Sequence, residues 1–390
     1  MKRVLLLNVA VVCLFQPLAG RQARTVPDST QYDVRTLARI EQVVRDAIQE
    51  KQALGAIVVV GSRNRILYQR AFGQRTIGPA AEPMTLDTIF DMASLTKATA
   101  TATSILILAE RGRLSLSDRV SKHIPEFKNK EAVTLRHLLT HYSGLRPDVD
   151  VKTSWKGYET GMQLAYEEKL EAEPGTKFIY SDINYFLLSE VVHRVTGQFI
   201  NDFARHNIFE PLGMKETGFL PPAAKKPRIA PTEPRDGEII RGEVHDPTSF
   251  RMGGIAGHAG LFSTAHDMSI FAQMILNGGI YRGVRILSPY AVLAMTTPQS
   301  PSGSSQARGY GWDIDTSYSI PRGDFFPAGS FGHTGFTGTS LWMDPQSAMF
   351  VLVLTSRLYP EGKGNVTSLR ARVASVAASA VRIDIRKLYR

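Results

Sequence analysis

The chain has 390 residues, of which 43% are hydrophobic and 21% charged, so it is long enough to bury a large core and has a globular composition. Its formal net charge of +10 comes from scattered lysines and arginines that do not alternate with aromatic residues, which excludes a dedicated nucleic-acid-binding surface. The only cysteine, Cys13, lies within the first twenty residues.

The first twenty residues have the pattern of an export signal. Lys2 and Arg3 form a charged start, residues 4–15 are mostly apolar, and residues 17–20 end in small side chains. The apolar run is short for a membrane span, and a polar segment follows at once, which favours a signal over a buried first helix. We therefore expect a signal peptide over 1–20 and a linker over 21–33. The mature chain would be periplasmic or secreted, without cysteine, disulfides or stable membrane insertion.

The predicted elements begin with a helix and a hairpin. Apolar residues recur at helical spacing over 34–49, and the β-rich run 55–60 turns into a second strand at 66–68. A strongly helical pattern follows over 94–111, and the region 135–209 is rich in helix.

The last part of the chain predicts another helix and a second hairpin. Residues 267–276 have a helical pattern with Thr264 as a plausible N-cap, strand patterns at 338–343 and 348–355 flank a turn, and a helix over 366–381 follows. Strands near both chain ends thus bracket a helix-rich middle. The simplest fold is one antiparallel sheet formed by both ends of the chain, with a helical region inserted between them.

The most informative motif is Ser94-Leu95-Thr96-Lys97, at the predicted start of the long helix. Residues three apart on a helix share a face, so the amine of Lys97 is expected to reach the hydroxyl of Ser94. A serine becomes a nucleophile when a neighbour takes its proton, and a buried, partly neutral lysine can do so. Alone, the same spacing also fits a capping serine followed by a solvated lysine.

A second motif is Tyr180-Ser181-Asp182, which follows a turn and precedes a helix. A tyrosine phenol beside a lysine ammonium is a credible proton relay, because the cation stabilises phenolate character. The plain alternative is a packed tyrosine, with Ser181 or Asp182 capping the helix that follows.

A third motif, His333-Thr334-Gly335, opens the predicted C-terminal strand pair. A glycine at this place lets a substrate backbone lie close against the strand edge. The plain alternative is an ordinary turn into a strand.

In this order, the three motifs resemble those of the serine β-lactamase and penicillin-binding protein family, in particular its class C β-lactamase-like branch. That family has S-x-x-K at a helix start, Y-x-N in a helical region, and K-T-G or H-T-G on a strand. Four further segments resemble the family's T-x-x-x-L-L-x-H-x-S-G-L, N/D-x-N-Y/F-x-L-L, P-L-G-M and G-L-x-S-T-A-x-D patterns, and they are residues 134–145, 182–188, 211–214 and 260–267. The resemblance extends from about residue 34 to the C-terminus.

The resemblance implies an α/β fold of the α+β type. One hydrolase domain over residues 34–390 would hold an antiparallel sheet flanked by helices, with an all-helical part over roughly 98–300 inserted in it. The active site would lie between the sheet and the helical part.

The resemblance also implies roles for the matching residues. Ser94 would attack a carbonyl to give an acyl-enzyme, and Lys97 and Tyr180 would manage the proton. The main-chain N–H groups of Ser94 and Phe336 would form the oxyanion hole. The substrate would lie against Asp182, His333, Thr334, Gly335 and Phe336.

Two residues depart from the family pattern. Asp182 stands where the family usually has asparagine, and it could pair with Lys97 and hold it charged, or be oriented away as an acceptor. His333 replaces the lysine typical of β-lactamases, and a histidine offers only partial positive charge near neutral pH. We therefore expect a weak hold on a substrate carboxylate that improves as the pH falls, which favours a peptidase or esterase over an efficient β-lactamase.

The sequence thus predicts a metal-independent serine hydrolase without a cofactor or a nucleic-acid partner. Its expected substrate is a small molecule or a peptidoglycan peptide, either a D-alanyl-type peptide as in DD-carboxypeptidases or a small ester. A class C-like β-lactamase and a penicillin-binding sensor without turnover remain alternatives. The residues His245, Asp246, His258 and His266 fit no zinc spacing, and capping and turn roles are preferred for them.

Overall fold

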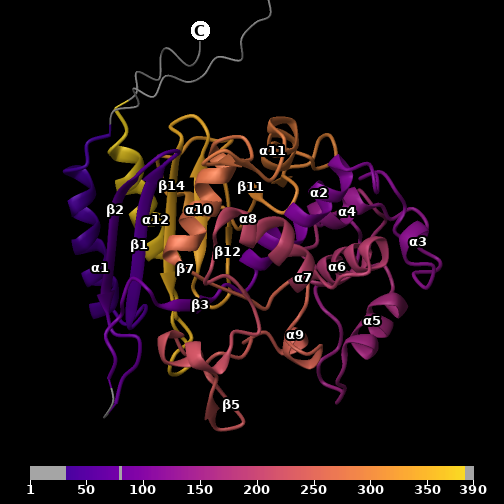
Figure 1. Ribbon diagram of the computed structural model, residues 1–390, viewed down its shortest axis with the longest axis horizontal. Coiled ribbons are helices and arrows are strands. Elements are labelled where there is room, and N and C mark those ends of the chain that lie inside the picture. Colours follow the sequence, from indigo (N-terminus) through magenta and orange to yellow (C-terminus); the bar gives the residue numbers. More distant parts are fainter. Residues whose placement is uncertain (1–31, 79–80, 383–390) are drawn as a thin grey trace, which may run out of the picture.

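The computed structural model describes residues 32–78 and 81–382 of the chain (Figure 1). The expected signal segment 1–20, Cys13 and most of the 21–33 linker lie outside these residues. Within them, no helix is both long enough and apolar enough to cross a membrane.

A seven-stranded antiparallel sheet joins the two ends of the described chain. Its spatial order is β10-β11-β12-β13-β14-β1-β2. The strands are β1 (Gly55–Ser62), β2 (Ile66–Gly73), β10 (Ala307–Arg308), β11 (Asp313–Asp315), β12 (Phe331–Thr334), β13 (Ser340–Asp344) and β14 (Met349–Thr355). Because β1 pairs with β14, the predicted sheet from both chain ends is confirmed, and so are the two predicted hairpins.

The central strand β1 explains how the sheet is covered, because all eight of its residues are buried. Successive side chains of a strand point to opposite faces. Val58 and Val60 pack with the helices α1 (Ile40–Gln49) and α12 (Thr367–Ser379) on one face, whereas Ile57 and Val59 belong to the larger core on the other face. The sheet is therefore the middle layer between two sets of helices, as Figure 1 shows.

Helices make up most of the other regular elements. They are η1 (Thr36–Arg39), α1 (Ile40–Gln49), η2 (Lys97–Ala102), α2 (Thr103–Glu110), α3 (Val120–His123), α4 (Leu135–Thr140), α5 (Tyr158–Glu167), α6 (Ile183–Thr196), α7 (Ile200–Ala204), η3 (Arg205–Phe209), α8 (Glu210–Leu212), η4 (Ala223–Arg228), α9 (Pro247–Arg251), α10 (Ala265–Leu276), α11 (Pro289–Thr296), η5 (Ile320–Arg322) and α12 (Thr367–Ser379). In Figure 1, α2 to α7 lie together on the side of the molecule away from α1. The helix α10 packs on the sheet, although it lies within the range expected for the helical part. Its predicted cap is confirmed, because the side chain of Thr264 accepts the N–H of Asp267.

The remaining strands are short, and three of them form a small sheet that contains the segment before Ser94. They are β3 (Ile89–Asp91), β4 (Gly218–Phe219) and β7 (Leu261–Thr264), in the order β3-β7-β4, and the two hairpins β5 (Pro234–Arg235) with β6 (Glu238–Ile239) and β8 (Ile280–Tyr281) with β9 (Val284–Arg285). The strand β3 leads directly into the turn that carries Ser94. Since β3 is held by β7, this turn is fixed to a segment more than 150 residues away in the sequence.

Candidate active site

Ser94 lies in a tight turn between β3 and η2. The N–H of Ala93 donates to the Asp91 carboxylate at 2.8 Å, and Ala93 has a φ of +45°, a left-handed conformation that is costly for a residue with a Cβ. The N–H of Lys97 then donates to the carbonyl of Ser94 at 3.1 Å. A bond between residues three apart is the pattern of a 3₁₀ turn, in which their side chains eclipse. The predicted shared face of Ser94 and Lys97 is therefore confirmed.

The helix that follows is wider than expected. The sequence predicts one α-helix over 94–111, but η2 (Lys97–Ala102) is a π-type segment, and regular α-helix begins only at α2. Every residue of η2 is buried. π-type turns are frequent at functional sites.

Lys97 is completely buried and fully paired. Its Nζ donates to Ser94 Oγ at 3.0 Å and to the main-chain carbonyl of His258 at 3.1 Å, and it lies 2.5 Å from Asp182 Oδ1. Burial alone would lower the pKa of Lys97, but the charge of Asp182, followed by Tyr180, outweighs burial and raises this pKa above its usual range. Of the two alternatives for Asp182, the structure shows pairing with Lys97, which keeps the amine protonated.

Tyr180 lies against this amine and is held by a histidine. Its ring centroid is 5.1 Å from Lys97 Nζ, and its ring stacks on that of His141 at 4.4 Å. His141 has a φ of +62° at the end of α4, and its Nδ1 accepts the N–H of Ser181 at 3.1 Å. The 134–145 segment thus places the tyrosine. Neither Ser181 nor Asp182 caps α6: Ser181 donates to Arg146, and Asp182 makes no capping bond.

His333, Thr334 and Gly335 lie at the end of β12, a separate strand that pairs with β13. The sequence predicted that these residues open the strand at 338–343. This prediction is wrong, because they belong to the end of the preceding strand. A Cβ on Gly335 would lie only 2.5 Å from the carbonyl oxygen of Met92. The glycine is needed here because the strand end packs directly against the turn that carries Ser94, whereas the sequence suggested close approach of a substrate.

The expected partial charge on His333 is wrong. His333 is 4% exposed, and its Nδ1 lies 2.8 Å from the carbonyl oxygen of Thr334, which can only accept. Nδ1 therefore carries the proton, and Nε2 is an acceptor with no partner among residues 32–78 and 81–382. Burial first, then the charges of Arg308 and Lys97, lower the pKa of His333 well below its usual value. His333 is a neutral side chain at physiological pH, and sequence alone could not show its burial.

A pocket of about 450 Å³ brings these residues together, and it also contains cations that the sequence did not single out. Its lining includes Ser94, Tyr180, Tyr318, His333, Thr334, Gly335 and Phe336, together with the basic residues Arg308, Arg357, Lys363 and Arg370. Phe336 lies at the rim, with 61% of its surface exposed. Asp182 reaches the site through Lys97 and is not part of this lining.

Two of the four cations are buried. Arg308 is 1% exposed and pairs with Asp313 at 3.2 Å, while its Nε and Nη2 have no partner in the described chain. Arg370 donates to the carbonyls of Gly335 and Thr339, and burial lowers its pKa to about 9, so it stays charged near neutral pH. These arginines lie in a two-residue strand and in α12, and no local pattern connects them to the motifs.

Of the four residues that the sequence offered as metal ligands, all in the described part of the chain, only Asp246 and His258 contact each other through their side chains. His258 Nε2 meets Asp246 at 2.7 Å, whereas His245 contacts Glu233 and His266 is exposed. Asp246 also caps α9. Side-chain oxygen and nitrogen atoms of Asp182, Asp246 and His258 lie within 4.8 Å of one another, but Asp182 already pairs with the ammonium of Lys97. The group fits an internal ion-pair network better than a metal centre.

A further carboxylate, Asp148, lies beside this network. Its Oδ2 accepts a bond from Thr248 at 2.7 Å. Burial is the largest cause that raises its pKa from 3.8 to about 6, with the positive charge of His258 opposing and the charge of Asp182 adding to the rise. A carboxyl whose pKa is raised on folding stabilises the folded state fully below its unfolded pKa, and this contribution is lost as the pH rises through about 6.

Asp148→Asn is therefore expected to increase the free energy of unfolding at pH 8 by about 1–3 kcal/mol. At about pH 4 the wild-type carboxyl is largely protonated in the folded state, so the same substitution is expected to have little effect. Urea unfolding of both proteins at the two pH values measures the difference. An equal effect at both would contradict the raised pKa.

Comparison with known proteins agrees with the motifs. A family model described as beta-lactamase matches residues 40–375. A protein of Salmonella schwarzengrund named "Putative D-alanyl-D-alanine carboxypeptidase" is 32% identical over 370 residues, which cover 85% of each chain. A protein of the same name from Salmonella typhi has the same identity and coverage.

Solved structures share the fold. EstCE1, described as a hydrolase with promiscuous acyltransferase activity, superposes with a TM-score of 0.73 at 22% identity, covering 88% of this chain and 99% of its own. A penicillin-binding protein homologue from Caulobacter crescentus gives a TM-score of 0.72 at 21% identity, covering 89% and 98%. The expected family and fold class are confirmed.

Proposed function

Because the chain belongs to the beta-lactamase family of serine hydrolases, we propose that it cleaves a D-alanyl-type peptide or depsipeptide through an acyl-enzyme on Ser94. The observation that carries this proposal is the 3.0 Å contact between Lys97 Nζ and the Oγ of Ser94, a residue that lines a pocket rich in cations. The named relatives agree with this substrate class. Periplasmic or secreted protein would meet such peptides.

The proton path starts from a protonated lysine. An ammonium cannot accept the proton of Ser94, so we assign this role to the phenol oxygen of Tyr180, whose ring lies beside Lys97, after the Lys97–Tyr180 pair has lost one proton. Ser94 Oγ then attacks the carbonyl carbon, and the leaving amine or alkoxide takes the proton back from Tyr180. The N–H groups of Ser94 and Phe336 would hold the oxyanion. Water repeats the sequence to release the acid.

The pocket cations favour a substrate with a carboxylate. Arg308 lines the pocket and pairs with Asp313 through one nitrogen, but its two other donor nitrogens have no hydrogen-bond partner in the described chain, and buried donors without an acceptor are costly. A substrate carboxylate would pair with it, as neutral His333 cannot. These donors of Arg308 therefore favour a peptide with a free C-terminus over a neutral small ester. Arg308 takes the role of carboxylate-binding residue that the sequence suggested for His333.

A matched pair of substrates tests this. N-acetyl-D-alanyl-D-lactate with a free carboxylate is expected to have a kcat/KM about ten- to a hundredfold above that of its C-terminal amide, the value of one charge-assisted hydrogen bond. The ratio should stay level between about pH 5.5 and 8, because His333 remains neutral. Steady-state hydrolysis of both compounds gives the ratio.

The double variant Arg308→Gln/Asp313→Asn removes both charges of the buried pair, and it should bring the ratio close to one. The control is Arg205→Gln, which removes an exposed arginine paired with Glu210 in the helical part. A ratio that stays high in the double variant would assign carboxylate binding to the other pocket cations.

A class C-like β-lactamase is the second candidate, because β-lactams also carry a carboxylate that the pocket cations could bind. A penicillin-binding sensor would acylate without turnover. Steady-state hydrolysis of a cephalosporin that is faster than that of the depsipeptide would favour the β-lactamase. A single burst of acylation without later turnover, seen with both substrates, would favour the sensor.

A further inference from the structure

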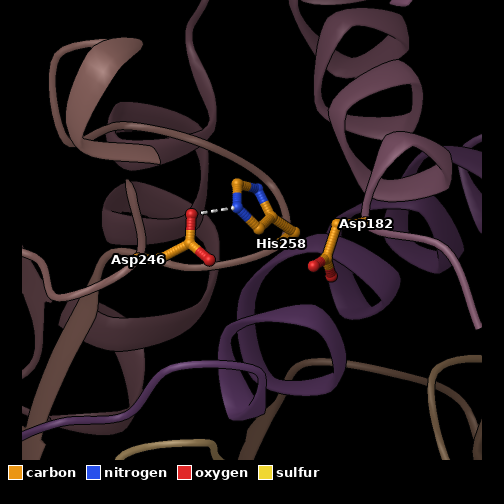
Figure 2. A group of neighbouring side chains, drawn as sticks. All are labelled: Asp182, Asp246 and His258. Atoms are coloured by element: carbon orange, nitrogen blue, oxygen red, sulfur yellow. Dashed lines mark hydrogen bonds and ion pairs between the residues drawn. The ribbon is translucent and has the colours of Figure 1, made fainter. Parts of the chain in front are cut away.

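His258 and Asp246 form a buried ion pair directly behind the catalytic lysine. His258 is 1% exposed, its Nε2 lies 2.7 Å from Asp246 Oδ1, and its main-chain carbonyl accepts a bond from Lys97 Nζ. Figure 2 shows the imidazole between Asp246 and Asp182, with its bond directed to Asp246. One residue thus contacts Lys97 through its backbone and faces the partner of Lys97 with its side chain.

The charges of this cluster come from four elements. The groups that face His258 are Lys97 from η2, Asp182 before α6, Asp246 before α9, and Asp148 from the loop after α4. Burial lowers the pKa of His258, but the charges of Asp246 and then Asp182 outweigh burial and raise it. These carboxylates favour the imidazolium form of His258, and without its charge Lys97 would face the carboxylates of Asp148, Asp182 and Asp246 as the one cation of this cluster.

We propose that His258, held by Asp246, is a positioning residue that limits how strongly Asp182 favours the protonated form of the Lys97–Tyr180 pair. This inference rests on the proposed function and deepens it. The imidazolium and the ammonium both attract the negative charge of Asp182. The Lys97–Tyr180 pair can therefore lose one proton more easily, and it must do so before it can accept the proton of Ser94. The asparagine that the family usually has at this position is neutral and needs no positive charge beside it, whereas the carboxylate of Asp182 does.

The sign of the effect follows from electrostatics. Removing a positive charge next to a titrating pair favours its protonated state and raises the apparent pKa of the pair. This pKa sets the acid limb of the pH profile, which is the low-pH range where the rate rises with pH. Loss of the imidazolium should therefore move the acid limb to higher pH and leave the plateau above it nearly unchanged, whereas a purely structural defect would lower the rate equally at every pH.

The test measures the second-order rate of covalent labelling of Ser94 by a fluorophosphonate as a function of pH, using the intact protein. His258→Gln keeps a donor toward Asp246 but cannot carry a charge. We expect its acid limb to lie about one pH unit higher than that of the wild type, which is about tenfold slower labelling at a fixed pH on the limb. His258→Lys, which restores a positive charge, should return the limb toward its wild-type position.

Asp182→Asn should move the limb about one unit lower, and the double variant Asp182→Asn/His258→Gln should lie between the two single variants. The control is His193→Gln, since His193 is a histidine beside a carboxylate, Glu190, on α6 and outside the pocket lining. Its limb should not move.

A uniformly slower His258→Gln with an unmoved limb would overturn the inference while leaving the Ser94 mechanism intact. If His258→Gln does not fold, an unmoved limb in Asp182→Asn overturns it as well. Failure of the wild-type protein to label at Ser94 would contradict the proposed function itself.

Discussion

Ser94→Ala is expected to lower kcat/KM for the depsipeptide by at least about 10⁴-fold, because the variant has no oxygen with which to form the acyl-enzyme. The fold should survive, since the substitution removes one hydrogen bond from Lys97 and leaves Asp182 and the His258 carbonyl in place to pair with the ammonium. The measurements are steady-state hydrolysis and thermal unfolding. A loss of about 0.5–1.5 kcal/mol in stability is expected.

The matched control is Ser302→Ala, which removes the same hydroxyl from an exposed turn. Its kcat/KM should equal that of the wild type. Turnover of Ser94→Ala within tenfold of the wild type would rule out Ser94 as the nucleophile.

Lys97→Met is expected to lower kcat/KM by about 10²- to 10⁴-fold, because Tyr180 loses the cation that stabilises its phenolate form. It should also destabilise the protein, since Asp182 loses its partner and keeps its charge. The Asp182 side chain is 23% exposed, so about 1–3 kcal/mol is expected, less than for a fully buried orphan charge. Steady-state hydrolysis and urea unfolding measure the two effects.

The double variant Lys97→Met/Asp182→Asn separates the two effects. With both charges gone, its stability should return to within about 1 kcal/mol of the wild type, while its activity stays low. Recovery of activity together with stability would mean that Lys97 acts only as a structural cation.

The sequence predicted the sheet from both ends of the chain and the contact of Ser94 with Lys97. The apolar runs in β1, β13 and β14 are strong patterns, because every residue of these strands is buried. The separation of Ser94 and Lys97 predicted their contact, since three residues bring two side chains together in any tight helical turn.

The electrostatics of the site could not be predicted from the sequence. The strands β10 and β11 have two and three residues, too few for a periodic pattern, so Arg308 and Asp313 carried no signal. The charge of His333 depends on its burial and on Arg308, a neighbour from another strand. His258 and Asp246 were noticed as ligand types, but their relation to Asp182 and Lys97 exists only in the folded chain.

Peptide mapping of the covalent adduct tests the central claim most directly. The intact protein, treated with a fluorophosphonate or trapped at short times with the depsipeptide, is digested and its modified peptide is sequenced by mass spectrometry. We expect one adduct per chain, on Ser94, formed with the same pH dependence as depsipeptide hydrolysis. Hydrolysis of the depsipeptide with no adduct on Ser94, or an adduct on another residue, would contradict it.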